Sequence, residues 1–183
     1  MPRASTMSAQ GAWISSRRGA GSTIPNARFA RCASDWPPAQ GVFVTRILVD
    51  CRMAEWTGVG RYTVGLVRAL AMRDDLDVVA AVAPGASAFA DGLDTVTAAG
   101  NPFSPAGMTA LGRAVGRVAP DVTHCPHFPT PLPVRHPLVV TMHDLTPLLV
   151  AGVMPSRVRR TVYRGQVARA VRIADALLTL SHF

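Results

Sequence analysis

Short apolar runs alternate with longer amphipathic segments from residue 46 to residue 180. Apolar runs of this length, bounded by turn residues, are typical of strands buried inside a sheet. One of them is rich in β-branched residues and stops at Pro84-Gly85, a pair that ends a strand. The pattern predicts buried strands at Arg46–Asp50, Asp77–Ala83, Asp121–His124, Leu138–Met142 and Ala176–Leu180, with a short edge strand at Asp94–Ala98.

Three segments between these runs carry apolar residues at helical spacing. The first covers Gly60–Met72, and the second follows Ser104-Pro105, an N-cap residue with proline at the first helical position. The third runs from Ser156 to about Ile173. Strands that alternate with helices predict an α/β fold: a Rossmann-like, doubly wound, mostly parallel sheet with helices on both faces.

Residues 1–44 lack this pattern, because Pro, Ser, Gly and Arg are scattered there without helical or strand periodicity. We interpret them as a disordered extension, or as the result of a start codon assigned too far upstream. The folded domain is then expected at residues 45–183. No closing helix follows the last predicted strand, so we expect the chain to stop beside a ligand crevice, with a further segment missing.

Composition narrows the class of protein. The chain has 183 residues, of which 49% are hydrophobic and 16% are charged. This is enough apolar material for one core and is unlike a disordered chain. No apolar run approaches the ~18 to 20 residues that a membrane span needs. Cys32, Cys51 and Cys125 are far apart, which argues against a disulfide scaffold and favours a reducing, cytoplasmic compartment.

The formal net charge is +8, and every basic residue is an arginine. The arginines are scattered and the few aromatic residues do not alternate with them, which argues against a nucleic-acid partner. In the last predicted helix four arginines share an arc of about 120°. They are Arg157, Arg160, Arg164 and Arg172. A solvated face is the simpler interpretation, and peripheral contact with an anionic membrane or a lipid phosphate is the alternative.

A glycine-rich segment joins the first strand to the first helix. Gly58 and Gly60 would let the backbone approach a phosphate, which the unpaired N–H groups of the helix N-terminus would then stabilise. The alternative is a plain turn that needs glycine for a positive φ. Arg61 would assist the phosphate, or it is a solvated first-turn arginine. The segment lacks the Gly-x-Gly-x-x-Gly spacing of a dinucleotide site.

His143 and Asp144 follow directly after the strand that ends at Met142. Proteins of this fold class bind ligands at the carboxyl ends of their strands, so both residues are candidates for substrate contact. Asp144 has a second interpretation, as a turn or cap residue of the next loop.

His124 and His127 flank Cys125 at the end of another predicted strand. The His-x-x-His spacing invites a metal site, but the histidines lack the helical i, i+4 spacing and have no adjacent carboxylate. We therefore expect no metal here.

Five short motifs occur in the order found in one enzyme family. They are Arg46-Ile47-Leu48-Val49-Asp50, Gly58-Val59-Gly60-Arg61-Tyr62-Thr63, Asp121-Val122-Thr123-His124, Val139-Val140-Thr141-Met142-His143-Asp144-Leu145 and Ala174-Asp175-Ala176. Together they resemble the N-terminal domain of family 4 glycosyltransferases, which are retaining GT-B enzymes. The resemblance covers residues 46–183. The family includes many mannosyltransferases, so the resemblance favours mannose as the transferred sugar.

The resemblance implies two Rossmann-like domains that face each other across a cleft. The N-terminal domain holds the hydroxyl acceptor, a saccharide or a lipid-linked group, and the C-terminal domain holds the nucleotide sugar. This sequence matches only the first, so we expect it to be inactive alone. No cofactor or metal is implied beyond the nucleotide-sugar donor.

The resemblance also implies roles for individual residues. Gly58, Gly60 and Arg61 would face the donor phosphates from across the cleft. His143 would contact the transferred sugar or orient the reacting groups, and Asp144 would accept hydrogen bonds from its hydroxyls. The loop with His124 and His127 lies on the acceptor side. A competing hypothesis remains: a Rossmann-like fragment or partner subunit that binds without turnover.

Overall fold

The structure is a computed structural model that describes residues 44–85, 89–150, 153–154 and 156–180. The predicted extension at 1–44 therefore lies outside the described residues, apart from residue 44. The first strand begins at Thr45, where the sequence pattern predicts the start of the domain.

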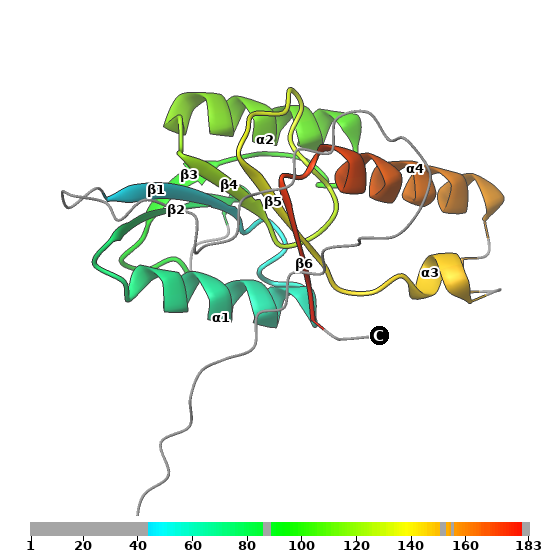
Figure 1. Cartoon of the computed structure of the whole chain (residues 1–183), viewed down its shortest axis with the longest axis horizontal. Helices are drawn as coiled ribbons and strands as arrows, with labels where there is room; N and C mark the ends of the chain where they lie inside the picture. Colours follow the sequence, from blue (N-terminus) through cyan, green and yellow to red (C-terminus); the bar gives the residue numbers. More distant parts are fainter. Residues whose placement is uncertain (1–43, 86–88, 151–152, 155, 181–183) are drawn as a thin grey trace, which may run out of the picture.

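Six parallel strands form one sheet among the described residues (Figure 1). Their order across the sheet is β3-β2-β1-β4-β5-β6, and every neighbouring pair is parallel. The strands are β1 (Thr45–Asp50), β2 (Leu76–Val82), β3 (Asp94–Thr97), β4 (Val122–Cys125), β5 (Leu138–Met142) and β6 (Ala176–Thr179). The mostly parallel sheet that the sequence predicts is thus parallel throughout this part of the chain.

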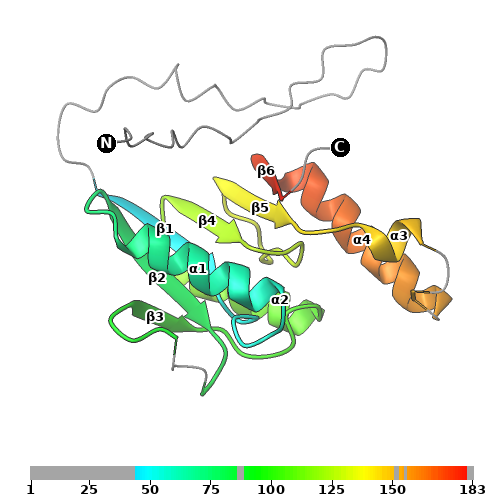
Figure 2. The same ribbon diagram turned by 90° about the horizontal axis from the view of Figure 1, so that it is seen from below.

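Helices cover both faces of the sheet (Figures 1 and 2). Helix α1 (Val59–Ala71) lies on one face, and helices α2 (Pro105–Val118) and α4 (Arg157–Ile173) lie on the other. The Ser104 hydroxyl caps α2 by accepting the Gly107 N–H at 3.0 Å, as its position before a proline predicts. The doubly wound α/β fold is confirmed.

Two apolar clusters pack against the two faces of the sheet. On the α1 face, Val67 of the helix packs with Val49 of β1 and Val78 of β2. On the opposite face the cluster joins α2 and α4 to the central strands. Its buried members include Leu48, Leu111, Phe128, Val140 and Val167. Because strand residues alternate between the faces, neighbours such as Leu48 and Val49 belong to different clusters.

The sequence pattern misses one element, the short helix α3 (Thr146–Leu149). Four residues with a proline near the start are too few to show helical periodicity. The other predicted elements agree with the structure to within one or two residues at each end. In the part of the chain that the structure describes, no helix has both the length and the apolar composition of a membrane span.

Candidate functional site

The direction of strand addition reverses between β1 and β4. The chain leaves β1 toward β2 on one side, and β4 lies on the other side of β1, so the loops after β1 and β4 diverge. Ligands in doubly wound sheets bind at such a reversal. The loop after β1 carries Gly58, the loop after β4 carries His127, and His143 follows β5. The fold therefore brings three sequence-predicted segments to one edge of the sheet.

The two glycines between β1 and α1 differ in the space that a Cβ atom would have. Gly60 lies so close to the carbonyl oxygen of Ala54 that a Cβ atom would collide with it. Packing inside the loop therefore explains this glycine. Gly58 has a φ of 74°, and a Cβ atom there would meet nothing within 4 Å. Gly58 thus combines a turn conformation with open space, which leaves the backbone accessible to a ligand.

Two amides in the first turn of α1 are already used within the chain. The Gly60 N–H bonds the Trp56 carbonyl oxygen at 3.0 Å, and the Tyr62 N–H bonds the Gly58 carbonyl oxygen at 3.2 Å. These two amides are therefore not free for a phosphate, and the helix dipole and Arg61 remain to stabilise an anion here. Arg61 is exposed at the first turn.

His143 is half-buried, and its ring is fixed by two contacts. Its Nε2 lies 2.7 Å from the carbonyl oxygen of Pro126, which can only accept. Nε2 therefore carries the proton in the neutral ring, and Nδ1 remains as a hydrogen-bond acceptor. The ring also packs edge-on against Tyr62 of α1, with 4.9 Å between the centroids. His143 thus offers an oriented acceptor atom at the edge of the sheet.

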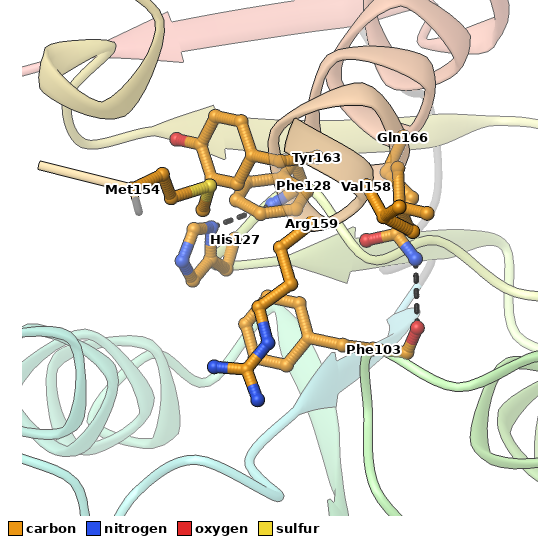
Figure 3. Close-up of a pocket in the computed structure, with 9 residues that line it drawn as sticks. Phe103, His127, Phe128, Met154, Val158, Arg159, Tyr163 and Gln166 are labelled. Carbon is orange, nitrogen blue, oxygen red and sulfur yellow. Dashed lines mark hydrogen bonds between the residues drawn. The ribbon is translucent and has the colours of Figure 1, made fainter. Parts of the chain in front are cut away.

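His127 has the opposite hydrogen-bonding role. Its Nδ1 accepts the backbone N–H of Phe128 at 2.9 Å (Figure 3), so the proton is on Nε2, which can donate. Burial, with a smaller contribution from the nearby His143, lowers the pKa of His127 from 6.5 to about 4. The ring is therefore neutral at physiological pH. The centroids of the His127 and His143 rings are 5.9 Å apart.

His124 lies beneath this edge, with only 6% of its surface exposed. Its Nε2 is 2.9 Å from the Thr141 hydroxyl, which in turn is 3.2 Å from the Tyr62 hydroxyl. Burial lowers its pKa from 6.5 to about 4. The chain of three polar groups links β4, β5 and α1 beneath His143. His124 therefore supports the site from the core and presents little surface to a ligand.

Asp144 is exposed, and one of its oxygens already has a partner. Oδ1 accepts the Thr146 N–H at 2.9 Å at the start of α3, the turn-forming role foreseen as its alternative. The backbone carbonyl oxygen of Asp144 accepts the Tyr163 hydroxyl at 3.5 Å. Since Oδ1 is engaged, Oδ2 is the carboxylate oxygen that has no bond within the described residues.

The structure contains a buried ion pair at the end of β1 that the sequence pattern does not predict. Asp50 is 2% exposed and Arg52 is 5% exposed. The guanidinium donates from Nε to Oδ1 and from Nη2 to Oδ2, both at 2.8 Å, and from Nη1 to the Gly107 carbonyl oxygen at 2.7 Å. Burial alone would lower the pKa of Arg52, but the hydrogen bond and charge of Asp50 more than offset it, and the pKa is raised. The pair ties the loop after β1 to the start of α2.

The sequence signal for this pair is an aspartate at the end of an apolar strand with an arginine two residues later. Among the described residues there is no group of three or more His, Cys, Asp or Glu side chains suited to a metal ion. The free cysteines Cys51 and Cys125 are both buried, and burial raises the pKa of each thiol.

The arginines of α4 separate into two groups. Arg157 and Arg164 are exposed, as is Arg172 near the end of the helix. Arg160 is partly buried and donates to the Leu148 carbonyl oxygen at 3.0 Å. The predicted charged face is thus present on the helix, with one of its four arginines held against α3.

Comparison with known proteins identifies the family. A family model described as Glycosyltransferase Family 4 matches residues 56–183, or about 70% of the chain. The chain belongs to glycosyltransferase family 4. Searches of curated proteins and of solved structures gave no match. The matched region of this family 4 chain begins in the glycine-rich loop and includes all three histidines of the candidate site.

Proposed function

We propose that this domain holds the hydroxyl acceptor while a sugar is transferred to it from a nucleotide donor, with retention at the anomeric carbon. Membership of family 4 supports a transferase function in general. One observation favours the acceptor role. His127 presents a donor at Nε2 and His143 presents an acceptor at Nδ1, on rings 5.9 Å apart. A sugar or alcohol hydroxyl both donates and accepts, and therefore suits such a pair.

The proposed sugar transfer requires an oriented acceptor hydroxyl and a stabilised leaving group. In the proposal, Nδ1 of His143 accepts the hydrogen bond of the attacking hydroxyl and aligns its oxygen. The diphosphate leaves toward Gly58, where the α1 dipole and Arg61 stabilise its charge. The free oxygen of Asp144 accepts from a hydroxyl of the transferred sugar. Retaining transfer passes through an oxocarbenium-like state, so nearby carbonyl and carboxylate oxygens would stabilise it.

A second domain supplies the donor site in this proposal, as the family resemblance implies. Mannose carried by guanosine diphosphate is the first donor to test. We propose no metal at His124 and His127, because the pair has neither helical spacing nor an adjacent carboxylate. Transfer is then expected to proceed unchanged in the presence of EDTA.

The test is a transfer assay by mass spectrometry with a panel of nucleotide sugars and hydroxyl acceptors. The chain is assayed alone and joined to a family 4 donor-binding domain. We expect transfer only in the joined form, and a loss of about 100-fold or more for His143→Ala. His136→Ala is the matched control, because His136 precedes β5 and lies at the opposite edge of the sheet.

Equal transfer by His143→Ala and wild type would refute the assignment of the site. The competing hypothesis is a module that binds without turnover. Acceptor binding to the chain, without transfer from any nucleotide sugar in the joined form, would favour it.

A further inference from the structure

An apolar pocket opens beside the candidate site, between α4 and the loops that precede α2 and follow β4. Its volume is about 500 Å³, within the range of roughly 300 to 1,000 Å³ that is typical of small-molecule sites. Its apolar walls include Phe103, Phe128, Val158 and Tyr163 (Figure 3). Val162 also lines the pocket.

The walls of the pocket are held in place by the fold. Phe128 is 1% exposed, and its ring contacts the rings of Phe103 at 5.4 Å and Tyr163 at 4.7 Å between centroids. Gln166 of α4 donates to the Phe103 carbonyl oxygen at 2.7 Å (Figure 3). Aromatic contacts and this hydrogen bond fix the back of the pocket, so it exists before any ligand arrives.

The pocket is continuous with the candidate site through His127. The His127 ring is one of its lining groups and also contacts the ring of His143, at 5.9 Å between centroids. A molecule whose hydroxyl lies at His143 can therefore extend its other end into the pocket. The loop after β4 thus contributes side chains to both the pocket and the candidate site.

One charged group lines the pocket. Arg159 extends from α4 toward the side where Phe103 lies (Figure 3). Its guanidinium forms no ion pair or hydrogen bond within the described residues, whereas those of Arg160 and Arg169 are bonded to backbone carbonyl oxygens. Helix α4 has no acidic residue. An anion bound beside the apolar walls would thus find an unpaired cation.

We propose that this pocket holds an alkyl or aryl group of the acceptor, and that the acceptor carries a phosphate or carboxylate that pairs with Arg159. The acceptor is then an amphiphile with three parts: a hydroxyl at His143, an apolar group in the pocket and an anion at its mouth. The role of this molecule as acceptor rests on the proposed function. The binding of an anionic amphiphile to the pocket does not rest on it, because binding is measured without sugar transfer.

The probe is octyl phosphate, kept below the concentration at which it forms micelles. Trp56 reports on the pocket, because its ring stacks on Phe103 with 5.8 Å between centroids. The other two tryptophans, Trp13 and Trp36, are replaced by phenylalanine in the full chain so that Trp56 is the only fluorophore of its kind. Octan-1-ol supplies the apolar part alone, and inorganic phosphate supplies the anion alone.

We expect saturable binding of octyl phosphate that is at least about tenfold tighter than that of either single-part probe. Val162→Glu places a charge in the lining and should weaken binding about tenfold or more. Val171→Glu is the matched control, since Val171 lies on the same helix outside the pocket and is 51% exposed, against 53% for Val162. It should change the affinity less than twofold.

Arg159→Gln should bring octyl phosphate to the affinity of octan-1-ol and leave octan-1-ol unchanged, whereas Arg172→Gln should change neither. If Val162→Glu loses its thermal unfolding transition, Val158→Glu replaces it, because Val158 is 73% exposed. No saturable binding, equal binding by the pocket variants and wild type, or equal affinity for octyl phosphate and octan-1-ol would each overturn the proposal. If the chain binds octyl phosphate but the joined form transfers no sugar, only the proposed function is contradicted.

Discussion

The ring of His143 meets the ring of Tyr62 edge-on, with 4.9 Å between centroids and 88° between planes. One residue follows β5 and the other lies in the first turns of α1. Gly58 is four residues before Tyr62, a distance of about 6 Å along a helix axis. The contact therefore fixes the imidazole relative to the glycine-rich loop, although the two segments are far apart in the sequence.

Substitutions at Tyr62 should separate the ring contact from the hydroxyl contact. Tyr62→Phe keeps the ring against His143 and loses only the hydrogen bond to Thr141, for about 0.5 to 1.5 kcal/mol of stability. Tyr62→Ala also removes one of the two contacts that orient the imidazole, so it should lower transfer in the joined form by about tenfold or more. Urea unfolding and the transfer assay measure the two effects. Equal transfer by both variants would show that the ring does not orient His143.

Three glycines of the loop and first helix should respond differently to alanine. Gly60→Ala is expected to destabilise the fold by about 2 to 4 kcal/mol, because its Cβ atom would collide with the Ala54 carbonyl oxygen. Gly58→Ala should cost about 1 to 2 kcal/mol, for its positive φ alone. Gly65 lies mid-helix with open space around it, so Gly65→Ala should stabilise by about 0.5 to 1 kcal/mol. The midpoints of urea unfolding test the order.

Removing one partner of the buried ion pair should be costly. Asp50→Asn leaves the Arg52 charge buried without its counter-ion, with an expected loss of about 3 to 5 kcal/mol. Asp75→Asn is the control, because Asp75 and Arg73 form an exposed pair, whose loss is expected to change stability far less. Losses of the same size in both variants would mean that Arg52 finds water or another partner when Asp50 is neutral.

Acid should destabilise the fold through His124. Its pKa is about 4 in the folded chain and 6.5 for an unperturbed histidine, so the unfolded chain binds the extra proton over that interval. Stability is therefore full above pH 6.5 and falls as the pH drops from 6.5 to about 4, by on the order of 2 to 3 kcal/mol for this group. Urea midpoints across this range measure the effect.

His124→Gln provides the control, since a glutamine amide can reach the Thr141 hydroxyl without titrating. It should flatten the dependence, leaving the part that comes from His127, whose pKa is lowered in the same direction. An unchanged slope would place the acid sensitivity elsewhere.

Binding to anionic vesicles tests the arginines of α4. If the exposed face meets a membrane, the double variant Arg157→Gln, Arg164→Gln should bind vesicles of anionic lipid about 30-fold more weakly, at about 1 kcal/mol per arginine. The charge-matched control is Arg68→Gln, Arg113→Gln, on exposed positions of α1 and α2. Vesicle sedimentation that does not depend on the anionic lipid fraction would leave the face as a solvated surface.

Most of the fold is predictable from the sequence because each element carries its own local signal. The β-branched run of β2 and the Ser104 cap of α2 are examples in which packing and propensity agree. Helix α3 is the exception. It is stabilised by contacts that residues 146–149 make with Asp144 and Arg160, and no periodicity in four residues can reveal such contacts.

The candidate site is less predictable, because its chemistry depends on tertiary contacts. The position of His143 after a strand is visible in the sequence, but the Pro126 carbonyl oxygen that selects its tautomer is not. Likewise, position 60 requires glycine because the Ala54 carbonyl group lies too close for a Cβ atom, and only the folded loop brings the two together. The pocket joins Phe103, Phe128 and Val162, which lie in three separate segments.

One part of helix α4 packs in the core, and another part lines the pocket. Val167 and Ala170 are buried in the core, whereas Val158 and Val162, one to three turns earlier, line the pocket while remaining mostly exposed. Substitution of the first pair threatens folding, and substitution of the second pair changes the shape of the pocket at little cost to the core. The same helix can thus accept new ligand preferences in evolution or engineering without a compensating change elsewhere in the domain.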